Sequence, residues 1–308
     1  MKRVFGLFLV GLMAAPVSAQ IVVDGAKDAG YGAALAVQTV DTQFGDNFSE
    51  WNAGYAVISG GNLNLMLTGN LEANFNKLSI FIDSKAGGQS VFDSSGNDNA
   101  NRMDGLVFDA GFTADYHLIA RRGGSQFDLD FANLGAQSAS GYINIFSGSG
   151  VGAGATGTGV NASPIGVAYD GSNVAGVIGG TAAANQAAAA AVTTGLELSI
   201  ALSDLGYVGG PINVMVGQNG GGHDYWSNQF LGGLPTDLMN QGAPNTGTGT
   251  HNLGGDGFGV FTGEGSIDFT TLAGNQYFTL NAIPEPASAV LLGLGSLLAM
   301  TVGRQRKQ

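Results

Sequence analysis

The chain has no cysteine among its 308 residues, so disulfide bonds and thiol chemistry are excluded. Basic residues are also scarce. Between residues 20 and 281, six Lys and Arg stand against 22 Asp and Glu, which gives this stretch a net charge of −16. An acidic surface repels nucleic acid and anionic lipid, so neither is an expected partner.

The groupings that catalysis needs are missing too. No serine has the glycines of a Gly-x-Ser-x-Gly motif, and His117, His223 and His251 lie far apart without metal-ligand spacing. The glutamates show no spacing that pairs two carboxylates for glycoside hydrolysis. The glycine-rich stretches lack the Lys-Ser/Thr of a phosphate loop. The sequence therefore predicts a protein that is not an enzyme.

What the chain does have is glycine, 53 residues of it, spaced between short apolar runs. Runs of alternating apolar and polar residues bounded by Gly or Asn predict strands. They fall at 55–58, 63–67, 77–83, 106–108, 114–120, 127–131, 142–146, 165–169, 196–200, 212–216 and 277–280. In the run 77–83, Leu78, Ile80 and Ile82 alternate with polar residues and Phe81, which indicates a half-buried strand. This spacing predicts an all-β body over 20–281, a single β-sandwich of jelly-roll-like form.

Two segments depart from the strand pattern. Residues 148–159 are rich in Gly, Ala and Thr and predict a flexible surface loop. Residues 181–192 contain a run of alanines and have the highest helix propensity in the body, which favours one short helix or a poorly ordered excursion.

The first 19 residues have the three parts of a secretory signal peptide. Met1-Lys2-Arg3 is a charged start, 4–15 is an apolar run, and Val17-Ser18-Ala19 is a small-residue cleavage site. This predicts export through the secretion machinery and cleavage by a signal peptidase after Ala19. The alternative is a signal anchor that is retained.

Residues 282–308 form a second tripartite segment. Pro284-Glu285-Pro286 is followed by an apolar run over 287–303, and then by the basic residues Arg304, Arg306 and Lys307. A helix of this length reaches about 25 Å, at the short limit for a transmembrane helix. The basic end predicts a cytoplasmic C-terminus.

This order of elements resembles the PEP-CTERM sorting signal of exported bacterial proteins. The resemblance implies processing by an exosortase-type membrane peptidase. It also implies a transient stop at the inner membrane, followed by release to the cell surface or the extracellular matrix. The alternative is a plain C-terminal anchor with a Pro-rich stem.

A second resemblance concerns the body. Residues 65–71, 76–84 and 194–206, together with Asp24-Gly25, look like the strand pattern of the family-nine carbohydrate-binding modules and the related DOMON-type sandwiches. The likeness implies a sandwich fold and a carbohydrate ligand.

One acidic loop is a candidate calcium site. Oxygen-bearing side chains recur at alternate positions, as Ca²⁺ ligation requires. They are Asp93, Ser95 and Asn97, with Asp98 and Asp104 nearby. Asp98 stands where an EF-hand loop has Gly, and Asp104 stands in place of its Glu. The alternative is a solvated turn rich in Asp and Asn.

Aromatic residues mark a candidate carbohydrate site. His223, Tyr225 and Trp226 follow a glycine triplet and are expected to lie in a loop, with Trp51 as the other tryptophan. Rings in such a loop stack on pyranose faces, while neighbouring amides orient the sugar. The alternative is packing of both tryptophans in the core. The sequence thus favours an exported, non-catalytic surface or matrix protein that binds carbohydrate or exopolysaccharide. The competing interpretation is a purely structural surface protein with no small ligand.

Overall fold

The computed structural model describes residues 20–94, 96–232, 267–272 and 274–281. The predicted signal peptide over 1–19 and the predicted sorting signal over 282–308 lie outside these residues, as do Pro284, Glu285, Pro286, Arg304, Arg306 and Lys307. In the part of the chain that is described, no helix has the length and apolar character needed to span a bilayer.

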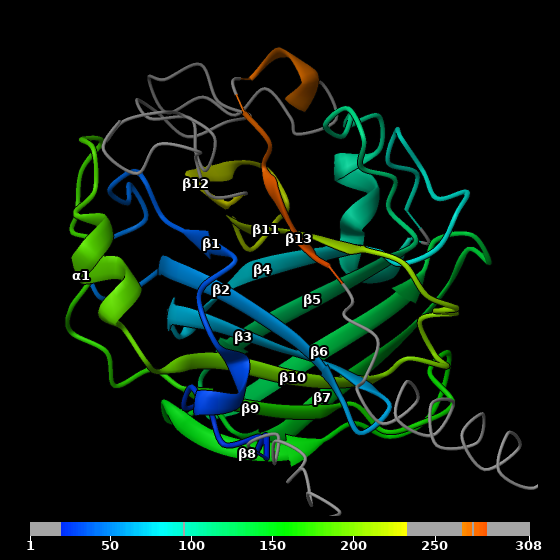
Figure 1. Cartoon of the computed structure of the whole chain (residues 1–308), viewed down its shortest axis with the longest axis horizontal. Helices are drawn as coiled ribbons and strands as arrows, with labels where there is room; N and C mark the ends of the chain where they lie inside the picture. The colour runs from blue at the N-terminus through cyan, green and yellow to red at the C-terminus, as the bar shows by residue number, and fades with distance from the viewer. Residues whose placement is uncertain (1–19, 95, 233–266, 273, 282–308) are drawn as a thin grey trace, which may run out of the picture.

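Two antiparallel sheets make up the body, which confirms the all-β prediction (Figure 1). Sheet I has the order β1-β2-β3-β10-β9-β8: Ala36–Val37, Glu50–Ser59, Asn62–Asn70, Gly195–Ala201, Gly166–Asp170 and Val151–Ala155. Sheet II has the order β12-β11-β4-β5-β6-β7: Trp226–Leu231, Ile212–Asn219, Asn74–Asp83, Tyr116–Gly123, Gln126–Asn133 and Ser138–Ser147. A further strand, β13 (Tyr277–Leu280), pairs with β11 beside β12. The short helices among these residues are η1 (Ala29–Tyr31), η2 (Asn97–Met103), α1 (Gln186–Ala191) and η4 (Phe269–Thr271).

The main core lies between the two sheets. Leu65 and Leu67 of β3 and Leu78, Ile80 and Ile82 of β4 belong to this cluster and are fully buried. The period-two alternation of β4 is therefore confirmed. Its outer face, however, is also buried, because Phe81 packs in a second cluster there. The expectation of a half-buried strand was wrong in this respect.

The second cluster covers the outer face of sheet II. Residues between β4 and β5, together with η4, lay aromatic side chains on this face; the cluster includes Phe81, Phe92, Phe108, Phe112, Trp226, Phe230 and Phe269. A smaller third cluster, with Tyr31, Tyr55 and Ala189, lies under η1 and α1 on the outer face of sheet I. Loops thus bury both outer faces of the sandwich in part.

Three local expectations were wrong and one was confirmed. The stretch 148–159 contains strand β8, and 106–108 forms only isolated bridges. Trp226 begins a strand, β12, and does not lie in a loop. The short helix expected within 181–192 is present as α1.

Buried amides close the sandwich at the β12 edge. Asn228 donates to the carbonyl of Asp41 (2.7 Å) and accepts from the backbone N–H of Gln43 (2.9 Å). Gln229 donates to the carbonyl of Val40 (2.9 Å) and accepts from the backbone N–H of Trp51 in β2 (3.1 Å). The side chains of β12 therefore join sheet II to the segment that precedes β2.

Candidate functional site

The acidic loop turns one carboxylate inward. Asp98 and Asn99 have left-handed backbone conformations, with φ values of 50° and 60°, which break η2. The Asp98 carboxylate lies 2.8 Å from Nζ of Lys77 and 3.2 Å from Nη1 of Arg121. Lys77 Nζ also donates to the backbone carbonyl of Asp98 (3.1 Å). The loop is therefore fastened to the outer face of sheet II by an ion pair.

The other candidate calcium ligands are scattered. Asp104 accepts the backbone N–H of Ser94 (2.7 Å), Asp93 is exposed, and Ser95 lies outside the described residues. Asn97 is the first residue of η2. In the described ranges, no three His, Asp or Glu side chains come together to hold a metal. Asp98 forms ion pairs with two cationic side chains. Its carboxylate is therefore not free to bind Ca²⁺ as the sequence predicted.

The side chains around Asp98 are mostly charged, and they change its pKa. Burial alone would raise the pKa of this carboxyl, but neighbouring His223 and Lys77 and the charge of Arg121 lower it to about 2. His223 Nε2 lies 3.9 Å from the carboxylate. Burial lowers the pKa of His223, so this ring stays neutral near pH 7. Arg121 also pairs with Asp128 and Asp130 on β6, which completes a network of two cations and three carboxylates.

The aromatic candidates do not form an open platform. Trp226 is 0% exposed and packs on Phe230, with ring centroids 5.5 Å apart. Trp51 is 1% exposed, and its indole donates to Gln218 (3.1 Å) in the core between the sheets. His223 is buried as well. Since a sugar cannot stack on a buried ring, the predicted platform was wrong, and the packing alternative holds for both tryptophans. Tyr225 is half-buried and packs against Phe44, with the two ring centroids 5.1 Å apart.

A buried glutamate of sheet I has a structural role. Glu197 of β10 accepts the backbone N–H groups of Asp24 (2.9 Å) and Gly25 (3.0 Å) and the hydroxyl of Tyr31 (2.8 Å). It is 0% exposed, and burial raises its pKa. This carboxylate fastens the start of the body to sheet I.

Asp109 lies in the loop region over sheet II and gives the protein a pH-dependent stability. Burial raises the pKa of its carboxyl to about 6, although the backbone N–H of Gln276 donates to it (2.6 Å) and acts in the opposite direction. The folded protein therefore holds this proton more tightly than the unfolded chain, whose Asp titrates near pH ~4. The contribution of Asp109 to stability is complete below pH ~4 and is lost as the pH rises towards ~6, by about 3 kcal/mol.

Replacing Asp109 with Asn removes this loss. We expect the stability of the Asp109→Asn variant, relative to the unsubstituted protein, to rise by about 2–3 kcal/mol between pH 4 and pH 7. Urea denaturation at several pH values measures it. Asp93→Asn, at an exposed carboxylate, is the control and should follow the unsubstituted protein. If the two proteins show the same dependence of stability on pH, ionisation of Asp109 does not destabilise the folded protein.

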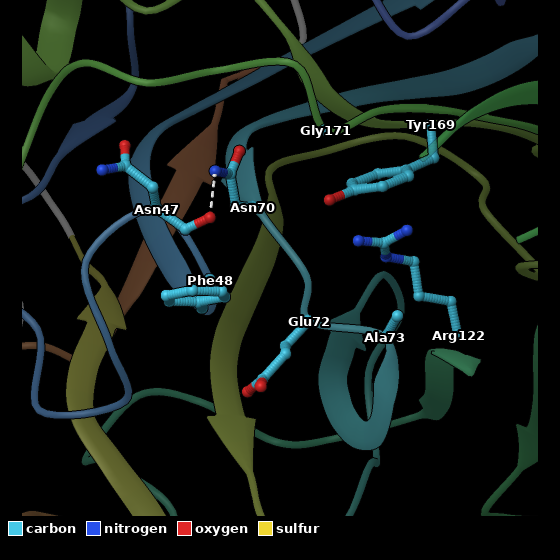
Figure 2. Close-up of a pocket in the computed structure, with 8 residues that line it drawn as sticks. All are labelled: Asn47, Phe48, Asn70, Glu72, Ala73, Arg122, Tyr169 and Gly171. Carbon is cyan, nitrogen blue, oxygen red and sulfur yellow. Dashed lines mark hydrogen bonds between the residues drawn. The ribbon is translucent and has the colours of Figure 1, made fainter. Parts of the chain in front are cut away.

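An open pocket of about 280 Å³ lies where the chain crosses from β3 to β4 (Figure 2). Its lining comes from four separate parts of the chain: Asn47, Phe48, Asn70, Glu72, Ala73, Arg122, Tyr169 and Gly171. In Figure 2, Phe48 and Arg122 lie on opposite sides of the opening. The Phe48 side chain is 60% exposed, so one aromatic ring is accessible at this pocket.

The walls of the pocket are held by hydrogen bonds. Buried Glu50 accepts the backbone N–H of Asn47 (2.9 Å), which holds the turn that carries Phe48. Arg122 donates to the carbonyls of Leu71 and Gly148 and lies over the Tyr169 ring, with Cζ 5.3 Å from its centroid. Among the described residues, no carboxylate lies within ion-pair distance of Arg122. Its positive charge is therefore available at the pocket.

Asn70 is the polar group at this pocket that lacks a partner. Its Nδ2 donates to the carbonyls of Asn47 (2.8 Å) and Asn173 (2.9 Å), which fixes the orientation of the amide. Its Oδ1 is buried and has no hydrogen-bond partner in the described structure. A buried acceptor left without a partner costs about 1–3 kcal/mol.

Comparison with known protein families, with curated proteins and with solved structures finds no match. The pocket residues therefore have to be interpreted from their own geometry. The sequence held one signal for them, since Arg122 is one of only six cations in the body. Phe48 and Asn70 carried no pattern that sets them apart from other loop and strand residues.

Proposed function

We propose that this protein is an exported, non-catalytic surface or matrix protein whose body binds carbohydrate at the Asn70 pocket. Export rests on the signal peptide and PEP-CTERM resemblances over 1–19 and 282–308, with exosortase-type processing as their consequence. Carbohydrate binding rests on the pocket, within the jelly-roll-like sandwich expected from the strand pattern. The ligand class is that of exopolysaccharides and related glycans.

The lining of the pocket carries this proposal. Glu72 supplies an acceptor and Arg122 a donor, so the lining offers both kinds of group to the hydroxyls of a sugar. Phe48 adds an accessible ring for the apolar face of a pyranose. At about 280 Å³ the pocket lies at the low end of small-molecule sites, which suits one or two sugar units.

The Phe48→Ala variant tests the proposal. We expect this change to weaken glycan binding roughly tenfold, because it removes the stacking ring, and to leave the thermal melt nearly unchanged, because the ring is exposed. A glycan array identifies a ligand, and isothermal titration then measures its affinity for each variant.

Phe75→Ala is the matched control. Phe75 is also an exposed phenylalanine, at 40%, but it does not line the pocket. Its removal should leave the affinity unchanged. Equal affinities for the two variants would place the ligand elsewhere. A glycan array without a single hit would favour the alternative of a purely structural surface protein.

A further inference from the structure

Among the described residues, strand β8 is an open edge of sheet I. It pairs with β9 on one side, from Val151↔Asp170 to Ala155↔Gly166, and ends the strand order on the other. On the β9 side, the carbonyl of Gly150 accepts the backbone N–H of Gly171, and the backbone N–H of Thr156 donates to the carbonyl of Ile165. By the alternation of an antiparallel ladder, the N–H and C=O groups of residues 151, 153 and 155 point away from β9. Figure 1 shows β8 at the lower margin of the molecule.

The remaining edges of the described sheets are protected. At the β1 edge, β1 has two residues, and the segment that follows it bridges to residues 179–183. The edge of β12 is bound through its amides to the segment before β2, and in β13 the Phe278 ring packs against Gly54 of β2. Strand β7 is interrupted by a register shift beside Asn144, whose φ is 55°. Short strands, covering segments and bulges are the devices by which proteins prevent edge-to-edge pairing.

In the described part of the chain, strand β8 has no strand paired along its outer edge and has no bulge. It keeps an unbroken register with β9 and contains neither proline nor a charged residue. Indeed, no charged residue occurs in the 39 positions from Phe131 to Tyr169, in a chain whose net charge is −12. Glycines at 152 and 154 lie against Phe146 and Ile145 of β7, and Val151, Ala153 and Ala155 are exposed. The edge is thus regular in register and its residues are uncharged, with small side chains.

We propose that β8 pairs with β8 of a second copy of this chain, antiparallel across a two-fold axis at Ala153. The distribution of charge favours a second copy of this chain as the partner of β8. Two acidic molecules repel each other over most of their surfaces, and this uncharged edge is where they approach with the least repulsion. The pairing satisfies the open N–H and C=O groups of residues 151, 153 and 155 in both copies and joins two six-stranded sheets into one. An interface of one short strand per copy makes a weak dimer, suited to a protein held at high local concentration on a surface.

The absence of cysteine makes the register directly testable. A two-fold axis at Ala153 places this residue opposite itself, at a Cα separation of about 5.5 Å that a disulfide can span. In the purified full chain carrying Ala153→Cys, we expect copper-phenanthroline oxidation to form the covalent dimer about tenfold faster than in the control Val208→Cys. Val208 is 94% exposed and lies outside the sheets, and both variants share every other residue, so association elsewhere contributes equally.

A second change separates pairing from simple exposure. Adding Ala155→Lys to the Ala153→Cys chain puts a charge on the edge, and the cross-linking rate should fall to that of the Val208→Cys control. Circular dichroism verifies that the strands are kept. Equal rates for Ala153→Cys and Val208→Cys, or a rate that is unaffected by Ala155→Lys, would overturn the proposal.

Discussion

Replacing Asp98 with Ala is expected to lower the free energy of unfolding by about 3–5 kcal/mol at pH 7. The change removes the partner of Lys77, whose side chain is 5% exposed, and one partner of Arg121. A buried ammonium without its carboxylate cannot recover its hydration, so the cost exceeds that of a surface ion pair. Urea or guanidinium denaturation measures the difference directly, and the melting temperature should fall by roughly 10 °C.

Asp93→Ala is the control for this prediction. Asp93 belongs to the same acidic loop and is exposed, and no ion pair involving it is found among the described residues. Its replacement should change the stability by less than about 0.5 kcal/mol. If both variants lose the same small amount, Asp98 does not fasten the loop. Should Asp93→Ala be costly only when Ca²⁺ is present, the calcium prediction would regain support.

The pH dependence of Asp98 has the opposite sign to that of Asp109. Its pKa in the folded protein, about 2, lies below the value near ~4 of an unfolded Asp. Its contribution is therefore complete above pH ~4 and is lost as the pH falls towards ~2. The stability difference between the unsubstituted protein and Asp98→Ala should accordingly narrow by about 2 kcal/mol across this range. A difference that stays constant would mean that its carboxylate does not interact with Lys77 and Arg121.

The strand content of this fold was predictable from local pattern. Alternation identified Leu78, Ile80 and Ile82 as one face of a strand, and that face lies in the core. The same pattern could not say what covers the opposite face. Phe81 is buried there by Phe92 and Phe108, which come from the chain after β4 and are brought back onto the sheet. Periodicity reports which residues share a face, whereas burial depends on segments that fold back from elsewhere.

The candidate sites were less predictable because their meaning depends on distant partners. Asp98 belonged to an array of oxygen ligands in the sequence, but its left-handed backbone turns it towards Lys77 of β4 and Arg121 of β5. The stretch that forms β8 was predicted to be a flexible surface loop. Its glycines instead permit close approach to β7, which a one-dimensional pattern does not report. The Asn70 pocket brings together Phe48 and Arg122 from separate parts of the chain, and no spacing in the sequence relates the two residues.

Trp226→Ala should likewise cost about 3–5 kcal/mol, since it empties a large volume in the cluster over sheet II. The ring lies against Phe230, and both occupy the space left by Gly217, where even a Cβ atom would come within 2.8 Å of the indole. We expect a melting temperature lower by roughly 10 °C and a reduced near-ultraviolet circular dichroism signal. Phe48→Ala, which removes an exposed ring, provides the comparison and should melt nearly as the unsubstituted protein does.

This contrast also decides which aromatic residue belongs to a ligand site. Replacing a residue that packs only in the core weakens glycan binding only if part of the protein unfolds. The Trp226→Ala variant should therefore keep the glycan affinity of the unsubstituted protein when both are titrated well below their melting temperatures. Phe48→Ala should show the reverse, a normal melt with weakened binding. Loss of affinity in fully folded Trp226→Ala would mean that the cluster over sheet II, and not the Asn70 pocket, communicates with the ligand, because a buried ring can act on a sugar only through the strands that it supports.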